Sequence, residues 1–372
     1  MGPIDLPPPA TFQERPGLAV VVAIGLLLCV DLLAKLAGLG LGPLGGSLSV
    51  ARLGSNLWNG LVIGLVIGLA GIGLSMTYSI LNFANFSHGD LVSTGAFTGW
   101  GVAFLIAAAG SQPLGALLTV RDAGDVTPGA IGAHVLSTPG AIIAGLLAAF
   151  AITALVSLAI DRTFYKPMRD RGSIALLITS VGVALVVRYL IQFVYGADRR
   201  GITASIDGDT IAAPLGISIT AHQLTIAVAA IALMVAMHYT LQRTKLGTAM
   251  RAMADNKDLA LITGIPTERV VTATWILGGG LAGASGYLYV LLRGTIQFDF
   301  GWSLLLLIFA AVILGGIGSI YGAIAGGLVI GLVFTTSTVW ISSDFNSAAA
   351  FTVMILVLLL RPEGLFGGVS TA

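Results

Sequence analysis

Five polar side chains that could do chemistry lie close together between two long apolar stretches. The segment NFANFSHGD, residues 82–90, contains Asn82, Asn85, Ser87, His88 and Asp90. The nearest formally charged residues are Arg52 before this segment and Arg121 after it. A histidine and an aspartate in such surroundings can serve as acid and base, hold an ion or proton, or line a path for a polar solute.

The composition requires that these residues be positioned by membrane helices. Of the 372 residues, 56% are hydrophobic and 9% are charged, against about 25% charged in ordinary soluble domains. The apolar runs are long and lack the alternation of a transmembrane barrel. We therefore expect an all-α, polytopic transmembrane helical bundle. The formal charge of +1 gives no indication of nucleic acid binding, and the single cysteine, Cys29, cannot form an intrachain disulfide.

Apolar runs between breaker residues predict about nine or ten spans. The expected spans are 17–37, 56–81, 88–109, 140–161, 173–195, 219–240, 269–292, a long run at 302–337, and 348–360. The sequence GGIGSIYG divides the long run, so we expect two short helices joined by a glycine turn. The residues of that predicted hinge are Gly315, Gly316, Gly318 and Ser319.

Lysine and arginine in the short loops predict the orientation of the spans. The loops 162–172 and 242–268 are basic and should be cytoplasmic. Splitting the long run also brings Arg361 to the cytoplasmic side. The segments 110–139 and 196–218 should then lie outside a cell membrane.

The cytoplasmic loop 242–268 has a pattern of its own. Leu246, Met250 and Met253 are spaced as on one face of a short amphipathic helix. Asp255, with Asp258 three residues later, is expected to cap a second short helix that ends before glycine and proline. Two such helices could form a protruding surface that another protein binds. The alternative is an ordinary solvated loop.

The polar segment and a second intramembrane charge leave several interpretations open. Asp90 could face an interior path, or it could cap a helix at an interfacial turn. Two interpretations of Arg188 are favoured: it could snorkel outward, or it could make an interhelical hydrogen bond. The alternative is that it pairs with Asp90 or with another subunit. No lysine follows a glycine, so the chain has no P-loop for ATP. The histidines His134, His222 and His238 show no metal-ligand spacing, so we expect no metal site.

Several motifs in order resemble the membrane permease subunits of branched-chain amino acid ABC importers. They are NGLVIGLVIGLAGIGLSMTYSILNFANFSHGD (59–90), IDRTFYKPMRDRGSIALLITSVG (160–182), LGTAMRAMADNKDLALITGIPTERV (246–270), AVILGGIGSIYGAIAGGLVIG (311–331) and LRPEGLFG (360–367). Asp90 stands where that family usually has glutamate, Tyr321 where it has proline, and Arg188 where it is uncharged. The resemblance covers about 56–367.

The resemblance implies an importer subunit with no catalytic residues and no bound cofactor, since ATP would be used by partner subunits. Residues 56–367 would be the permease domain, and 1–55 an N-terminal extension with one extra helix. The partners would be a homologous sister permease, two cytoplasmic ATP-binding cassette subunits, an extracytoplasmic solute-binding protein and the lipid bilayer. The segment 242–268 would be the coupling segment, with Arg251, Ala254, Asp255, Asp258, Ala260, Gly264 and Ile265 contacting the ATPase.

In this interpretation the polar segment 82–90 is a gating or structural cluster beside the pathway. The solute would be a branched-chain or other hydrophobic amino acid, with urea or short amides as the alternative. An ion-coupled secondary transporter using His88 and Asp90 is a rival of another class, and a membrane enzyme ranks last because no nucleophile or metal constellation accompanies them.

Overall fold

The computed structural model describes residues 16–41, 44–110, 134–203 and 209–366. The chain divides into two units, Met1–Gly54 and Ser55–Ala372. In the first unit α1 (Pro16–Leu36) is the helix expected at 17–37, and β1 (Gly40–Leu41) pairs antiparallel with β2 (Leu44–Gly45). Asp31 and Lys35, four residues apart on α1, form an ion pair with 2.8 Å between Oδ2 and Nζ.

The fold of the second unit is the predicted polytopic helical one. Eight helical segments among the described residues are long and apolar enough to cross a membrane. They contain α2 (Val50–Leu81), α3 (His88–Ala107), α6 (Pro139–Ile160), α7 (Ser173–Tyr195), α8 (Ala221–Arg243), α11 (Thr267–Arg293), α13 (Ile320–Thr336) and α14 (Asn346–Leu360). The shorter apolar helix α12 (Phe300–Gly315) precedes α13. The chain is therefore a multi-pass membrane protein.

Short elements connect these helices. The helical ones are η3 (Asp161–Tyr165), η4 (Lys166–Arg171), η5 (Pro214–Gly216), α9 (Lys245–Asp255), α10 (Lys257–Ile262), η6 (Ser337–Val339) and η7 (Ser343–Phe345). β3 (Arg200–Gly201) pairs antiparallel with β6 (Thr295–Ile296), and β4 (Thr210–Ala212) with β5 (Ser218–Thr220). Most of the segment predicted outside at 110–139 falls outside the described residues, as does position 367.

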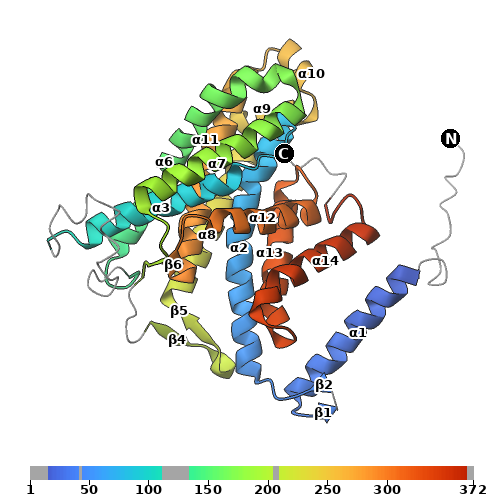
Figure 1. The fold of residues 1–372 in the computed structure, drawn as a ribbon. Helices are drawn as coiled ribbons and strands as arrows, with labels where there is room; N and C mark the ends of the chain where they lie inside the picture. The colour runs from blue at the N-terminus through green and yellow to red at the C-terminus, as the bar shows by residue number, and fades with distance from the viewer. Residues whose placement is uncertain (1–15, 42–43, 111–133, 204–208, 367–372) are drawn as a thin grey trace, which may run out of the picture. The chain divides into compact units, whose positions relative to one another are not determined.

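The centre of this unit is built on close contacts between glycine-rich helices (Figure 1). In α2, 89% of the most apolar window is buried, against 28% in α7, so α2 is central and α7 peripheral. A Cβ atom at Gly95 of α3 would overlap the backbone of Gly283 of α11, and one at Gly286 would overlap the carbonyl of Val92. Small residues allow helices in lipid to approach this closely. The glycines of α11 therefore serve helix packing.

The long run predicted at 302–337 is divided as expected. α12 ends at Gly315, and α13 begins at Ile320 with Ser319 as its N-cap residue. Gly316 and Gly318 have φ angles of +105° and +86°, which L side chains rarely adopt, so the tight turn requires glycine here. With 16 residues, α12 is about 24 Å long, shorter than the hydrocarbon core of about 30 Å.

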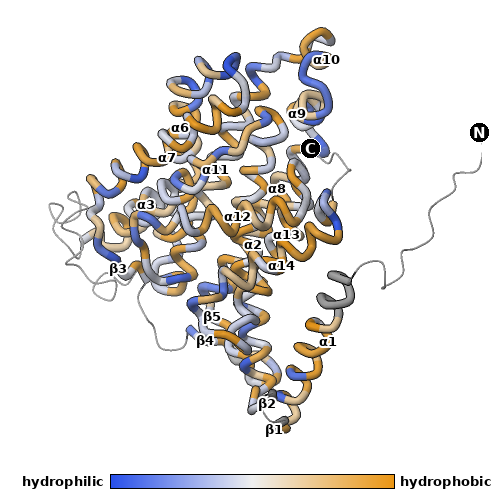
Figure 2. The backbone as a smooth tube through the Cα atoms, turned by 45° about the vertical axis from the view of Figure 1, so that its right-hand side comes forward, coloured by the Kyte–Doolittle hydropathy of each residue, from blue (hydrophilic) through white to orange (hydrophobic). Residues whose placement is uncertain are grey.

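Hydrophilic residues gather toward two ends of the unit, with hydrophobic stretches between them (Figure 2). α9 and α10 lie at one end, and the β4–β5 ribbon lies toward the other (Figures 1 and 2). This distribution fits a bundle whose middle is in lipid and whose ends are in water.

Candidate functional site

The polar turn between α2 and α3 contains the five candidate residues, and they do not form one group. Asn82 has a left-handed backbone, with φ of 52°, and an exposed side chain. Asn85, Ser87, His88 and Asp90 are all buried. Ser87 is the N-cap residue of α3, so Asp90 lies in the first turn of that helix.

Asn85 and Ser87 contact a tyrosine from the connection between α6 and α7. Asn85 Oδ1 accepts hydrogen bonds from Ser87 Oγ at 2.7 Å and from the Tyr165 hydroxyl at 3.2 Å. Ser87 Oγ and that hydroxyl lie 2.7 Å apart. The Tyr165 ring stacks on Trp275 of α11, with centroids 5.0 Å apart and 7° between the planes. We call Asn85, Ser87 and Tyr165 the turn cluster. Through Tyr165 it joins the α2–α3 turn to the α6–α7 connection and to α11.

Asp90 forms a buried ion pair with Arg188 of α7. Arg188 Nε donates to Oδ1 at 3.1 Å and Nη2 donates to Oδ2 at 3.0 Å, so the pair is bidentate. The guanidinium also lies over the Trp302 ring of α12, 4.8 Å from its centroid. Pairing with Asp90 is thus the alternative that is found. Of the two interpretations that the sequence favoured, the interhelical hydrogen bond is present as part of this pair, and outward snorkelling is wrong. A carboxylate with two acceptor oxygens lies within reach inside the bundle, whereas snorkelling would leave that carboxylate unpaired.

His88 is directed toward α2. Its Nε2 lies 2.9 Å from the carbonyl oxygen of Ala70, and its ring packs beside Gly73. The side chain is 1% exposed. His88 therefore has the position of a residue that holds α3 against α2, and its role in a pathway stays a prediction.

The segment 242–268 contains the two predicted helices. In α9, Met250 and Met253 are buried at the predicted spacing, and Thr244 caps the helix by accepting from the Gly247 amide at 3.1 Å. Arg251 Nη1 donates to the carbonyl of Leu241 in α8. The helix is therefore fixed to the bundle at its start and along its apolar face.

The predicted cap of the second helix is wrong by one residue. Asn256, not Asp255, is the N-cap residue of α10, and its Oδ1 accepts from the Leu259 amide at 2.9 Å. Asp255 is the last residue of α9 and Asp258 lies in the first turn of α10, so they form no capping box. Aspartate and asparagine are both good N-cap residues, and the break between the helices falls one residue later than the pattern indicates.

The predicted coupling residues all lie on this helical pair or just after it. Arg251, Ala254 and Asp255 are on α9, Asp258 and Ala260 on α10, and Gly264 and Ile265 in the connection to α11. Gly264 has φ of +86°, and Ile265 donates its amide to the Ala260 carbonyl at 3.0 Å. Ala260 is buried, but Leu259, Leu261 and Ile262 are 53%, 59% and 80% exposed. α10 thus presents an apolar surface at a polar end of the bundle.

An ionic network, which the sequence did not predict, lies beside this helical pair. Arg169 donates from Nη2 to both carboxylate oxygens of Asp161, at 2.6 and 2.7 Å, and from Nη1 to Glu268 at 2.8 Å. Lys166 Nζ lies 3.0 Å from the same Glu268. The network joins the α6–α7 connection to the start of α11. The only signal in the sequence was the cluster of charges in that connection, which the charge rule had already used for orientation.

The predicted glycine hinge is the turn between α12 and α13. Ser319 Oγ accepts from the Gly322 amide at 2.9 Å, and Ser79 Oγ of α2 donates to the Gly318 carbonyl at 3.1 Å. The C-terminal segment covers the end of α12, because the amides of Leu365 and Phe366 donate to its last carbonyls. The turn is held from several sides, and whether it moves as a hinge stays a prediction.

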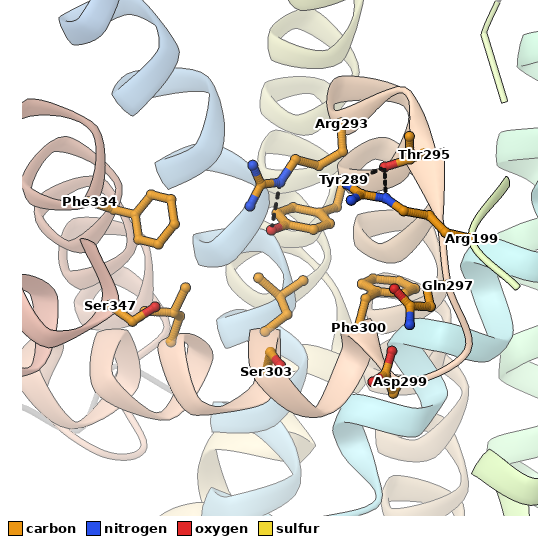
Figure 3. A pocket seen from close by; sticks show the side chains of 12 residues that line it. Arg199, Tyr289, Arg293, Thr295, Gln297, Asp299, Phe300, Ser303, Phe334 and Ser347 are labelled. Atoms are coloured by element: carbon orange, nitrogen blue, oxygen red, sulfur yellow. Dashed lines mark hydrogen bonds between the residues drawn. The ribbon is translucent and has the colours of Figure 1, made fainter. Parts of the chain in front are cut away.

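Two cavities lie along α12, and the sequence indicated neither. One, of about 350 Å³, is lined only by apolar and aromatic residues near the α2–α3 turn, including Phe86 and Phe309. The other, of about 370 Å³, lies where α11 ends and α12 begins (Figure 3). We call the second the α11–α12 pocket. Its lining residues are Arg199, Tyr289, Arg293, Thr295, Gln297, Asp299, Phe300, Ser303, Leu304, Leu307, Phe334 and Ser347.

Two of the remaining histidines are neighbours. His134 and His222 have ring centroids 4.3 Å apart, and His134 Nε2 lies 3.3 Å from Asp209 Oδ2. Across the described ranges, no group of three or more histidine, cysteine, aspartate or glutamate side chains could hold a metal ion.

Comparisons with known proteins point to one family. The family model described as "Branched-chain amino acid transport system / permease component" matches residues 56–360. A high-affinity branched-chain amino acid transport system permease protein, LivH of Escherichia coli (strain K12), is 28% identical over 314 residues, covering 84% of this chain and 94% of that protein. The permease protein BraD of Pseudomonas aeruginosa is 26% identical with the same coverage.

An archaeal relative shows the same similarity. The probable branched-chain amino acid transport permease protein LivH of Methanocaldococcus jannaschii is 27% identical over 309 residues, covering 80% of this chain and 88% of that protein. No solved structure matches this chain.

Proposed function

This chain belongs to the family of permease components of branched-chain amino acid transport systems, and we propose that it forms part of the translocation path of an ATP-driven importer of hydrophobic amino acids. It is a permease subunit without an ATPase of its own. We propose as its partners a sister permease, two cytoplasmic ATPase subunits and an extracytoplasmic binding protein.

The observation that carries this proposal is the exposed apolar surface of α10. Three of its six residues are large apolar side chains more than half exposed, at an end of the bundle where water is expected. Exposed apolar side chains of this density, surrounded by charged ones, are typical of a protein interaction site. We therefore assign α9, α10 and the following turn to contact with an ATPase subunit, with loops 162–172 and 242–268 on the cytoplasmic side.

A continuous set of contacts leads from α10 toward the membrane interior. α10 is followed by Gly264 and then by Glu268 at the start of α11. Glu268 binds Lys166 and Arg169, which belong to the same connection as Tyr165 of the turn cluster. Displacement of α10 by a closing ATPase dimer would therefore be transmitted to the α2–α3 turn through hydrogen bonds and ion pairs as well as through the backbone.

The Asp90–Arg188 pair is placed where such a displacement would have an effect. It joins α3 to α7 and lies beside Trp302 of α12, the helix that both cavities share. We propose that this pair fixes the relative positions of these helices while the pathway opens alternately to the two sides. The same pairing argues against an ion-coupled secondary transporter, because the carboxylate of Asp90 is already bound to a cation.

Reconstitution with and without the partners tests this proposal. In vesicles containing this chain, its sister permease, both ATPase subunits and the binding protein, we expect ATP-dependent uptake of leucine, isoleucine or valine against a gradient. We expect none from this chain alone. Uphill accumulation by the purified chain without those partners would refute the proposal.

A variant examines the α10 contact directly. Ile262→Glu places a charge in the proposed interface and should reduce co-purification of the ATPase subunits by about tenfold or more. Phe164→Glu is the matched control, since Phe164 is an exposed apolar residue of the α6–α7 connection and lies outside α10. Equal ATPase binding by both variants would remove α10 from the interface.

A further inference from the structure

The α11–α12 pocket is shaped by the segment that connects these two helices. α11 ends at Arg293, and the left-handed conformation of its C-cap residue Gly294 (φ +66°) turns the chain into β6. β6 pairs with β3, which brings Arg199 from the end of α7 to the pocket rim. The chain then turns again and starts α12 at Phe300, so that the first turns of α12 form one wall.

Charges of both signs face this pocket. Arg293 Nε donates to the Tyr289 hydroxyl at 3.1 Å, and in Figure 3 the guanidinium extends over the open space. Arg199 donates to Thr295 Oγ1 from Nε and Nη2, at 3.4 and 3.2 Å. Asp299 lies on the opposite side in that view. The ion pairs found among the described residues include none of these three charged groups.

Apolar side chains complete the pocket between the charged groups. Leu304 and Leu307 of α12 are buried, and Phe334 of α13 lines the same space. Tyr289 and Phe300 stack on one another, with centroids 5.8 Å apart and 7° between the planes. This stack holds the α11 and α12 walls in a fixed relation. A volume of about 370 Å³ is in the range of small-molecule sites.

We propose that the α11–α12 pocket is a solute-binding site that recognises a free α-amino acid as a zwitterion. The α-carboxylate binds Arg293 and Arg199, the α-ammonium group binds Asp299, and an apolar side chain lies against Leu304 and Leu307. This inference rests on the proposed function and adds to it the place and the chemistry of recognition.

The pocket chemistry distinguishes between the solutes that the sequence left open. Urea and short amides carry no net charge, so they would gain no charge-assisted contact from either guanidinium group or from the carboxylate. An α-amino acid satisfies charges of both signs at once. An acidic side chain of a docking protein would use the arginines but neither Asp299 nor the apolar wall, so the pocket favours a free amino acid.

Protection of a single introduced thiol tests this site. The one natural cysteine is replaced by Cys29→Ser, and Ser303→Cys places a thiol on the exposed pocket wall. The assembled transporter, without nucleotide or binding protein, is treated with a neutral maleimide at increasing leucine concentration. Ser342→Cys is the control. Ser342 directly precedes η7 and is exposed, but it does not line the pocket.

We expect leucine to slow alkylation of the thiol at position 303 and not of that at 342. Arg293→Gln should raise the leucine concentration for half protection by about tenfold or more, since it removes a charge-assisted contact. Arg52→Gln, which removes an exposed arginine outside the pocket, should leave it unchanged. Leucinamide and 4-methylpentanoate, which each lack one of the two charges, should protect less than leucine, and urea should not protect.

Three outcomes would overturn the site. They are no protection by leucine up to its solubility limit, equal protection by urea or leucinamide, and unchanged protection in Arg293→Gln. Each is independent of ATP-driven uptake by the full complex, which is measured in parallel. Failure of the site with intact ATP-dependent uptake leaves the proposed function standing, whereas protection without ATP-dependent uptake would overturn the function alone.

Discussion

The buried pair between Asp90 and Arg188 shows how a charge is tolerated among apolar helices. Each side chain satisfies the other through two hydrogen bonds. Removing one partner leaves an uncompensated charge, which costs about 3–5 kcal/mol in buried pairs. Removing both leaves two neutral groups of similar shape and costs much less. The free-energy cost therefore comes mainly from leaving one of the two charges unpaired.

We accordingly predict that Asp90→Asn and Arg188→Gln each reduce ATP-driven uptake, and that the double variant recovers part of the loss. Membrane abundance is measured by quantitative blotting, so that uptake is expressed per molecule. If abundance falls while uptake per molecule holds, the pair is structural only. Additive losses in the double variant would show that the two side chains do not act together.

Tyr165 allows the hydrogen bonds of the turn cluster to be separated from its ring contacts. Tyr165→Phe keeps the stack on Trp275 but removes the hydroxyl that bonds Asn85 and Ser87. We expect a loss of stability of about 1 kcal/mol, measured as a lower melting temperature in detergent. Tyr239→Phe, at an exposed tyrosine of α8, should melt unchanged. A melting temperature equal to wild type in Tyr165→Phe would mean that the turn is held by other contacts.

At the residue scale the sequence indicated where the polar group lies but not how it is divided. Proximity in sequence suggested one cluster. His88 and Asp90 are two residues apart in the first turn of α3, however, so their side chains leave the helix on different sides. Their partners, Ala70 and Arg188, come from distant positions, and no short-range pattern encodes such pairs. The pocket residues Arg199 and Arg293 were missed for the same reason, since a two-residue ribbon brings them together.

At the scale of elements, the connection after α10 provides the clearest prediction. Gly264→Val forces a β-branched residue into the left-handed region, which costs about 1–2 kcal/mol, and nothing lies within 4 Å of the added Cβ atom. We expect ATP hydrolysis to continue while uptake falls, with normal amounts of protein in the membrane. ATPase activity and uptake are measured on the same vesicles.

The matched control for this change is Gly110→Val. Gly110 has a similar φ of +84° and the same open surroundings, but it follows α3 and belongs neither to the segment 242–268 nor to the ionic network. Its ratio of uptake to hydrolysis should stay at the wild-type value. Equal uncoupling in both variants would attribute the effect to general strain and not to the α10 connection.

The close approach of α3 and α11 makes a second prediction at this scale. Gly95→Ala adds a methyl group where the Gly283 backbone already lies, so α3 or α11 must shift. Such overpacking costs about 1–3 kcal/mol or more, and we expect a lower yield of folded protein by size-exclusion chromatography. Gly182→Ala in α7, where nothing lies within 4 Å, should fold normally. A normal yield for Gly95→Ala would mean that the helices separate easily.

The helices themselves could be predicted well, because each needs only a long apolar run and a breaker. All the spans expected between 56 and 360 correspond to helices, including the division of the long run at the glycine turn. Helix ends were less certain, as the shift from Asp255 to Asn256 illustrates. A cap depends on one hydrogen bond, and two neighbouring residues can both supply it.

At the scale of the whole molecule, the permease unit combines a closely packed centre with two polar ends. The glycine contacts of α3, α6 and α11 fix the centre, whereas α9, α10 and the ionic network lie at one end. Sequence alone gave this division through hydropathy and charge. It could not give the cavities, because a cavity is the space left between side chains from several distant helices.

The ionic network also has a consequence for how the chain is made. Glu268 is synthesised 99 residues after Arg169, so we expect the α6–α7 hairpin to enter the bilayer before this carboxylate leaves the ribosome. During that interval the positive charges of Lys166 and Arg169 would keep the connection between α6 and α7 on the side where translation takes place. When α11 follows, Glu268 binds both cations. The same two positive charges that orient the nascent chain then connect the α6–α7 connection to α11 in the folded protein.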